Sequence, residues 1–227
     1  MPYSISTIVP VYNEEKNIKR TTRLLDTYLT SHFKTYEIII VESGSTDNTP
    51  LITDQLAKIN KHVHVVHQKT KKGFGNGLRE GYTHAKYDLV WYMSGDYPYD
   101  VHVLDRAIPL ISPVDYVVGY RTNRESISRS LLSKAYNLLI KLVFGLSIKD
   151  VNFSFKLIKK KALQQLNLQS DGWFIDVEIL IELKKKGFSC KQIPVTLLPR
   201  ISGKTKVKIV QTIKELLKEI YTYKRRT

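Results

Sequence analysis

Apolar runs alternate with amphipathic stretches along the chain. Short runs rich in β-branched residues predict buried strands at residues 4–9, 36–41, 62–66 and 88–93. Apolar residues spaced three or four positions apart predict helices at residues 14–30 and 73–85, and the pair Thr49–Pro50 predicts another helix start, with Thr49 as its cap. Further strand candidates are residues 114–119 and 153–158. The alternation predicts an α/β fold with a mixed, mostly parallel sheet flanked by helices.

The loops that follow three of the predicted strands carry carboxylates. These loops are residues 10–15, 42–48 and 94–100, and they contain Glu14, Glu42 and Asp96. Ligands of parallel α/β sheets bind beyond the carboxyl ends of the strands. We therefore expect the binding site at these three loops.

Two later helices combine an apolar stripe with many basic residues. The stripe of the predicted helix at residues 127–143 contains Ile127, Leu131, Ala135, Leu138 and Leu142. The stripe of the C-terminal helix, residues 207–223, contains Ile209, Ile213, Leu216 and Ile220. A basic amphipathic helix can lie in a membrane interface, and it can equally pack on its own sheet. The sequence leaves both alternatives open for each helix.

Composition restricts the partners. The chain has 36 Lys and Arg against 21 Asp and Glu, a net charge of +15, which favours an anionic partner. Nucleic acid is not expected, because the basic residues are spread along the chain and form no recognisable nucleic-acid module. Cys190, the single cysteine, fits a reducing compartment, and no uncharged apolar stretch approaches the roughly 20 residues of a membrane span. These features predict a soluble or peripheral protein, and our expectation is a peripheral position on the cytoplasmic face of a membrane.

Several other patterns are interpreted conservatively. Asp47 is expected to cap the helix after it. Strand alternation puts His62 and His64 on one face and His67 on the other, so the three are not expected to converge on a metal. The glycine run 73–77 is expected to form a tight turn beside the ligand, and the lysines before it a solvated charge run.

Four segments, in order, resemble glycosyltransferase family 2, and the most similar branch is the dolichol-phosphate mannosyltransferase-like enzymes. They are VPVYNEE at 9–15, VESGSTDNT at 41–49, GFGNGLREG at 73–81 and MSGD at 93–96. The resemblance continues through GYR at 119–121, residues 150–156 and 172–178, and PRISGKTK at 199–206. It covers essentially the whole chain.

The resemblance implies a GT-A (Rossmann-like) domain over residues 1–206. The basic helix at 207–227 is then part of that domain or appended to it. The implied reaction is an inverting transfer of a mannose-type or glucose-type hexose from a GDP- or UDP-linked sugar to dolichyl or polyprenyl phosphate. A membrane-anchoring partner is a further implication. A catalytically impaired nucleotide-sugar-binding protein, or a transferase acting on another glycan or hydroxyl acceptor, remains an alternative.

The resemblance also implies roles for individual residues. The catalytic candidates are Asp96 and Glu178, and Asp96 is the metal candidate. The donor-binding candidates are Pro10, Tyr12, Glu14, Glu42, Ser43, Gly73, Ser94, Gly95 and Asp96. The phosphate- or acceptor-binding candidates are Arg121, Arg129, Arg200 and Lys206.

Two serines depart from the family pattern. Ser43 stands where the family usually has a second aspartate, which leaves the nucleobase open. Ser94 replaces the first aspartate of the Asp-x-Asp motif, so only Asp96 remains. Mg²⁺ or Mn²⁺ is the expected cofactor, because such a cation can be held by one carboxylate together with water and substrate phosphates.

Overall fold

The computed structural model describes residues 2–123, 127–199 and 209–226, with only the backbone described at 127–129 and 209–214. Its strands are β1 (Ile5–Val11), β2 (Tyr36–Glu42), β3 (Val63–His67), β4 (Leu89–Tyr92), β5 (Tyr116–Arg121), β6 (Lys156–Lys159) and β7 (Cys190–Val195). Its helices are α1 (Ile18–His32), α2 (Thr49–Ile59), α3 (Phe74–His84), α4 (Val103–Ile111), α5 (Ile127–Phe144), α6 (Lys160–Leu163), α7 (Ile175–Lys185) and α8 (Ile209–Arg226).

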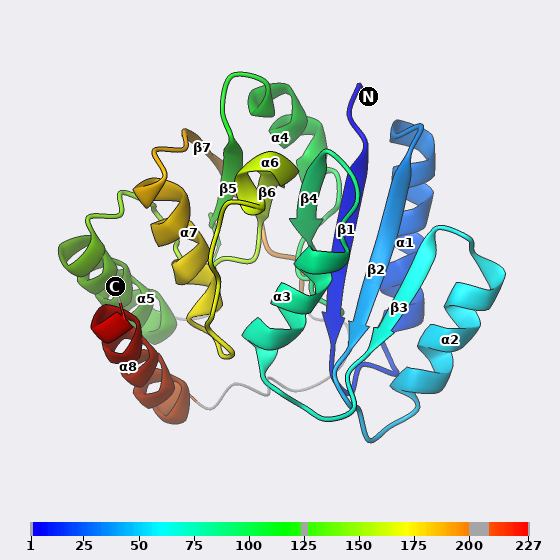
Figure 1. Ribbon diagram of the computed structural model, residues 1–227, viewed down its shortest axis with the longest axis horizontal. Coiled ribbons are helices and arrows are strands. Elements are labelled where there is room, and N and C mark those ends of the chain that lie inside the picture. Colours follow the sequence, from blue (N-terminus) through cyan, green and yellow to red (C-terminus); the bar gives the residue numbers. More distant parts are fainter. Residues whose placement is uncertain (1, 124–126, 200–208, 227) are drawn as a thin grey trace.

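The seven described strands form one mixed sheet, shown in Figure 1, in the order β3-β2-β1-β4-β6-β5-β7. The pairs β3–β2, β2–β1, β1–β4 and β5–β7 are parallel, whereas β6 runs antiparallel to both of its neighbours. The predicted mixed, mostly parallel sheet is therefore confirmed.

Helices cover both faces of the sheet, because the buried strands are apolar on both faces. In β2, Ile38 and Ile40 join a cluster with α1, α2 and α4, whereas Ile39 and Val41 join a second cluster with α3 and α5–α8. Successive side chains of a strand point to opposite faces, so a continuous apolar run requires cover on both sides.

The first helix begins later than the sequence predicts. It starts at Ile18, not at Glu14, and Asn17 occupies the cap position. The N–H of Glu14 donates to Thr49 Oγ1 (2.8 Å), and that of Glu15 donates to Asp47 Oδ2 (3.3 Å). These contacts to a distant loop keep residues 14 and 15 outside the helix. The helix after the loop begins at Thr49, with Asn48 at the cap position, so the prediction that Thr49 is the cap is wrong.

Four elements had no prediction, and the shortest of them is α6, a single turn of four residues. The pattern of α4 is interrupted by Pro109, and β7 is a half-exposed edge strand that contains Pro194. In α7 nearly every residue is buried, so the helix has no polar face to produce an amphipathic pattern.

The two basic amphipathic helices differ in the direction that their predicted apolar stripes face. In α5 the predicted stripe faces outward, with Leu131, Leu138 and Leu142 exposed, while Ile140 makes the buried contact. In α8, Leu216 and Ile220 of the predicted stripe are buried in the second cluster. Among the described side chains, the predicted stripe of α8 packs on the domain, whereas that of α5 does not.

We expect Gly81→Ala to destabilise the protein. A β-carbon at Gly81 of α3 would lie 2.2 Å from Ile8 Cγ2 and 3.2 Å from Val41 Cγ2. Overpacking of this kind costs about 1–3 kcal/mol, which exceeds the gain of about 0.5–1 kcal/mol from replacing a helical glycine. Urea denaturation should show a lower free energy of unfolding. The exposed Thr83→Ala in the same helix should stay within about 0.5 kcal/mol of the unaltered protein. Equal stability of the two variants would contradict this close packing.

Candidate donor and acceptor site

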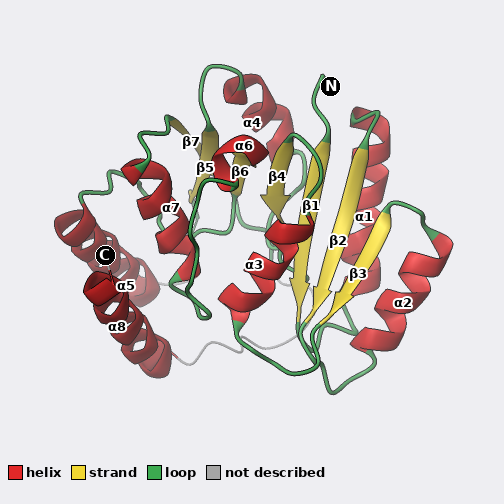
Figure 2. Ribbon diagram, in the orientation of Figure 1, coloured by secondary structure: helices red, strands yellow, loops and turns green. Residues whose placement is uncertain are grey.

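Three strand ends meet at one edge of the sheet, where the arrowheads of β1 and β2 converge in Figure 2. Val11 pairs with Glu42, and the next N–H along, that of Ser43, donates to Val11 O at 3.0 Å. On the other side of β1, the N–H of Met93 donates to Ile8 O at 2.9 Å. The segments containing Pro10, Tyr12 and Glu14, Glu42 and Ser43, and Ser94–Asp96 are thus brought together as predicted.

The first two loops interlock through side chains. Asn13, which has a positive φ of 55°, donates its N–H to Ser45 Oγ (3.0 Å) and accepts the N–H of Thr46 at Oδ1 (2.8 Å). Asp47 Oδ1 accepts the N–H of Thr49 at 2.9 Å. Asp47 thus binds the first N–H of α2, although the cap position itself belongs to Asn48 and not to Asp47 as predicted.

Asp96 lies in a tight turn after β4. The N–H of Tyr97 donates to Ser94 O at 3.0 Å, and Thr21 Oγ1 donates to Gly95 O at 2.7 Å. A β-carbon at Gly95 would lie 2.9 Å from Val11 Cγ1 and 3.3 Å from Glu14 Cγ, so the turn packs directly on the β1 loop. The half-buried Asp96 is thereby held beside the Glu14 segment.

Glu42 lies beneath the site and has a partner that was not anticipated. Its buried carboxylate accepts the N–H of Ser45 at 2.6 Å and lies 3.3 Å from His67 Nδ1, and His67 Nε2 lies 2.8 Å from Asp54 Oδ1. Burial lowers the pKa of His67, but the bonds to Asp54 and Glu42 outweigh it, and the net shift is upward. His67 is the residue that pairs with Glu42 across β2 and β3, a register that the sequence does not reveal.

The lysine run after β3 also reaches the site. The ammonium of Lys71 lies 3.9 Å from the ring centroid of Tyr12, a cation–π contact. The interpretation of this run as solvated charge agrees with the exposure of Lys69, Lys71 and Lys72, but it did not anticipate the contact of Lys71 with Tyr12. A β-carbon at Gly77 would lie 3.1 Å from Ser43 Oγ, which places the start of α3 against Ser43.

Gly73 is required by a neighbouring loop. Its φ is +102°, and a β-carbon there would lie 2.2 Å from Asp171 O. Asp171 O accepts the N–H groups of Gly75 (2.8 Å) and Asn76 (3.2 Å), and its carboxylate forms an ion pair with Arg79. Phe74 stacks on Trp173 with ring centroids 4.8 Å apart. The sequence predicts a tight turn over residues 73–77, but α3 begins at Phe74, so this prediction is wrong beyond Gly73. Residues 73–76, called the glycine turn below, form the start of α3 and pack against the 168–174 loop.

Arg121 lies at a basic pocket at the end of β5. Its guanidinium donates to both carboxylate oxygens of the buried Asp150, each at 2.7 Å. The pocket has a volume of about 350 Å³ and is lined by Arg121, Thr122, Ser130, Lys134, Asn137 and Lys149. The side chain of Arg129, and both Arg200 and Lys206, lie outside the described residues.

Glu178 and Asp176 of α7 are buried and paired with cations. Glu178 accepts the N–H of Ser170 at 2.8 Å and forms an ion pair with Arg226 at 2.7 Å. Asp176 accepts hydrogen bonds from Lys156 Nζ (2.7 Å) and Tyr92 OH (2.8 Å), and burial raises the pKa of its carboxyl. In this structure Glu178 therefore contacts the 169–170 backbone and α8.

The residues present fit a cation that also binds the donor. No group of three His, Cys, Asp or Glu side chains in the described parts of the chain could hold a metal ion. Asp96 supplies a carboxylate and Ser94 a hydroxyl at the same turn. This set suits a cation that shares its ligands with a diphosphate, and it does not suit a cation held by protein side chains alone.

The helices described here are too short or too polar to cross a bilayer.

Comparisons with solved structures agree with this fold. The glucosyl-3-phosphoglycerate synthase from Mycobacterium tuberculosis, in complex with Mn²⁺ and UDP-glucose, is similar with a TM-score of 0.74 at 16% identity, over 96% of this chain and 79% of that one. The same enzyme in complex with phosphoglyceric acid gives a TM-score of 0.73 at 15% identity, over 97% and 80% of the two chains.

Sequence comparisons give relatives along most of the chain. Glycosyltransferase AglD of Haloferax volcanii is 28% identical over 92% of this chain, which spans only 35% of that protein. An undecaprenyl-phosphate mannosyltransferase of Micrococcus luteus is 26% identical over 89% of this chain and 87% of its own length. The dolichyl-phosphate beta-glucosyltransferase ALG5A of Trichomonas vaginalis is 27% identical over 84% and 64% of the two chains.

A family model describes most of the residues that build the site. The model "Glycosyl transferase family 2" matches residues 6–167, which include the three strand-end loops, the glycine turn and Arg121. The resemblance noted in the sequence is thereby confirmed, and the chain belongs to glycosyltransferase family 2.

Proposed function

We propose that this chain transfers a hexose from a nucleotide-sugar to the phosphate of a polyprenyl-type lipid at a membrane surface. The observation that carries the proposal is the basic pocket beside the exposed stripe of α5. The helix that lines the pocket with Lys134 and Asn137 also exposes Leu138 and Leu142. A lipid phosphate needs both features, because cations bind its head group and apolar side chains enter the interface.

The relatives support this acceptor and this type of donor. Two of them are named as transferases to undecaprenyl phosphate and dolichyl phosphate, and similar solved structures contain UDP-glucose with Mn²⁺. Their names also favour transfer over binding alone. Since Ser43 replaces a residue of the family pattern, donors with either uracil or guanine are considered.

The strand-end loops suit the diphosphate of such a donor. Asp96 would hold a divalent cation, which would supply positive charge against the charge that develops as the diphosphate leaves. Lys71, above Tyr12, is a second cation at the same edge. The bond from the anomeric carbon to the diphosphate breaks as a lipid phosphate oxygen bonds to that carbon, with inversion.

A phosphate acceptor removes the need for a general base. Such a group is already ionised near neutral pH, whereas a hydroxyl acceptor must lose a proton. The buried pairing of Glu178 with Arg226 is compatible with this acceptor, because the transfer does not require Glu178 as a base.

We expect Asp96→Asn to lower kcat/KM for transfer about 10²-fold or more, because the leaving diphosphate loses its charge partner. The assay incubates labelled UDP-glucose or GDP-mannose with polyprenyl phosphate in micelles and Mg²⁺ or Mn²⁺, and labelled lipid is counted. Chelation should abolish transfer by the unaltered protein. Glu80→Gln, which changes a carboxylate of α3 outside the three loops, should stay within about twofold. No labelled lipid from the unaltered protein with either donor would refute the proposal.

The pocket should serve the acceptor and not the donor. We expect Lys134→Gln and Lys149→Gln each to raise the KM for polyprenyl phosphate about tenfold, since each removes one charge-assisted contact. The KM for the nucleotide-sugar should change less than twofold. A rise in the donor KM alone would contradict this assignment.

The outward stripe of α5 should carry membrane binding. We expect Leu138→Glu with Leu142→Glu to weaken binding to phosphatidylcholine–phosphatidylglycerol vesicles at least tenfold, because apolar contact is replaced by charge repelled from an anionic surface. Vesicle flotation measures this. The two side chains are 56% and 75% exposed, and Leu51 of α2, 64% exposed on the opposite side of the sheet, provides the control Leu51→Glu. Equal losses in both proteins would contradict a specific membrane face.

A further inference from the structure

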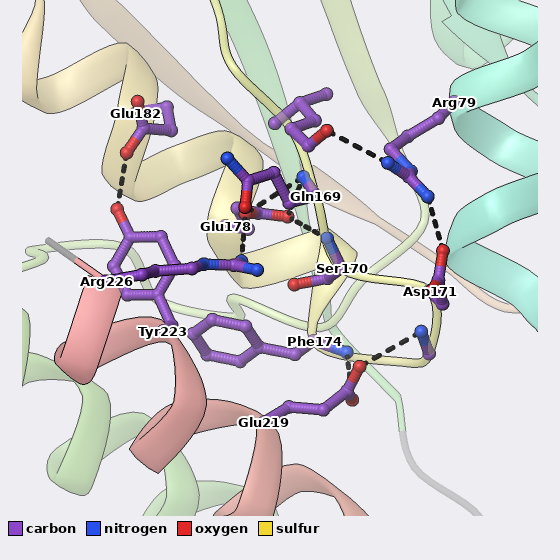
Figure 3. Close-up of polar contacts among 12 residues, drawn as sticks. Arg79, Gln169, Ser170, Asp171, Phe174, Glu178, Glu182, Glu219, Tyr223 and Arg226 are labelled. Atoms are coloured by element: carbon purple, nitrogen blue, oxygen red, sulfur yellow. Dashed lines mark hydrogen bonds and ion pairs between the residues drawn. The ribbon is translucent and has the colours of Figure 1, made fainter.

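A carboxylate of the C-terminal helix binds the backbone of the 168–174 loop (Figure 3). Glu219 Oε1 accepts the N–H of Gly172 at 3.0 Å, and Oε2 accepts the N–H of Phe174 at 3.1 Å. Burial raises the pKa of the Glu219 carboxyl, and the two N–H groups oppose that rise. Charge-assisted bonds to two N–H groups of one loop restrict the position of its backbone.

Arg226 of α8 supports the same loop indirectly, through Glu178 of α7. Arg226 donates to Glu178, which in turn accepts the N–H groups of Gln169 (3.1 Å) and Ser170 (2.8 Å). Tyr223 of α8 donates to Glu182 of α7 and packs on Phe174 with ring centroids 5.6 Å apart. Figure 3 shows these groups approaching the loop from α7 and α8 on one side, with Arg79 on the other. Both carboxylates that face the loop therefore depend on α8 for their position or their charge partner.

The far side of the loop holds the glycine turn of the donor site. Asp171 binds the N–H groups of Gly75 and Asn76, and Asn76 Oδ1 accepts a bond from Gln68 Nε2 at 2.8 Å. The same turn leads into Gly77, which lies against Ser43. The N–H of Gln68 in turn donates to Glu42 O at 2.8 Å, so a continuous set of polar contacts runs from α8 through the loop to the strand-end residues.

We propose that Glu219 and Arg226 are positioning residues for the nucleotide-sugar, and that Glu178 acts with Arg226 as part of the same support. The inference rests on the proposed donor site and concerns the element that holds it. Helix α8, which covers the second apolar cluster, thereby fixes the position of the 168–174 loop, and the glycine turn packs against that loop. Donor affinity then depends on α8, although α8 is far from the strand-end loops in the sequence.

The test compares substitutions on α8 in the full chain. Glu219→Ala should raise the Kd for UDP-glucose or GDP-mannose with Mg²⁺ about tenfold, equivalent to about 1.4 kcal/mol. Glu219→Gln, which keeps one acceptor oxygen, should give an intermediate value. Arg226→Ala should have a similar effect to Glu219→Ala, and Arg226→Lys should restore most of the affinity. Calorimetry without lipid measures the Kd, and the exposed Thr222→Ala on the same helix is the matched control, expected within twofold.

Two further readouts separate positioning from a general loss of structure. Hydrogen exchange should accelerate at residues 169–174 and 74–76 in Glu219→Ala, while β1 and β2 keep their protection. In the transfer assay the donor KM should rise while the KM for polyprenyl phosphate stays within twofold. These results together support the inference.

The contrary outcomes are distinct. A donor Kd within twofold of the unaltered protein in both Glu219→Ala and Arg226→Ala overturns the positioning role, whatever the exchange data show. Equal rises of donor and acceptor KM with faster exchange throughout the sheet also overturn it, because they indicate a merely structural role. If the unaltered protein binds neither nucleotide-sugar, the proposed donor site itself fails, and the inference fails with it.

Discussion

The candidate site depends on the parallel pairing of β1 with β2 and β4. This pairing sets Val11 opposite Glu42 and Ile8 opposite Tyr92, so that three loops leave the sheet at one edge. The pairing register has little freedom, because both faces of β2 are buried and a shift by one residue would move every side chain to the other face. The loops then lock together through side chains of modest size, such as Asn13 and Thr21, and Gly95 lets the last turn approach the first loop. Their geometry is thus a consequence of backbone pairing in the sheet.

In the other half of the molecule, the neighbouring helices α5 and α8 have two different roles. There, α5 turns its predicted apolar stripe outward, while α8 buries its own and reaches the 168–174 loop with a carboxylate. The two helices meet where Phe144 packs against Tyr223, with ring centroids 5.7 Å apart. A surface suited to lipid and a support for the glycine turn therefore lie in neighbouring helices.

Buried charge in this half occurs in pairs. Lys156 with Asp176, Arg121 with Asp150 and Arg226 with Glu178 each place a cation against a carboxylate that solvent does not reach. Removing one member of such a pair leaves an uncompensated charge, which costs far more than the pair contributes. The charged groups that hold the loops are therefore constrained by folding as well as by any ligand, and a carboxylate in a family motif, such as Glu178, can have a structural partner that the motif does not indicate.

The sequence by itself determined the α/β class, the strands that carry the site and the convergence of their loops. Apolar periodicity is a local property, and alternation of strands with helices favours a parallel sheet, in which the carboxyl ends of neighbouring strands meet at one edge. It also identified the family, because the motifs occur in order along the chain. Only the tertiary structure decided that helix α1 starts after Glu15. It also decided that His67 contacts Glu42 and that Lys71 contacts Tyr12. Finally, it decided that the predicted stripe of α5 faces outward while that of α8 faces inward. Those outcomes depend on which distant segment satisfies a backbone N–H, a carboxylate or an apolar face. No pattern within a single segment specifies that choice, because the partner is supplied by the packing of the whole chain.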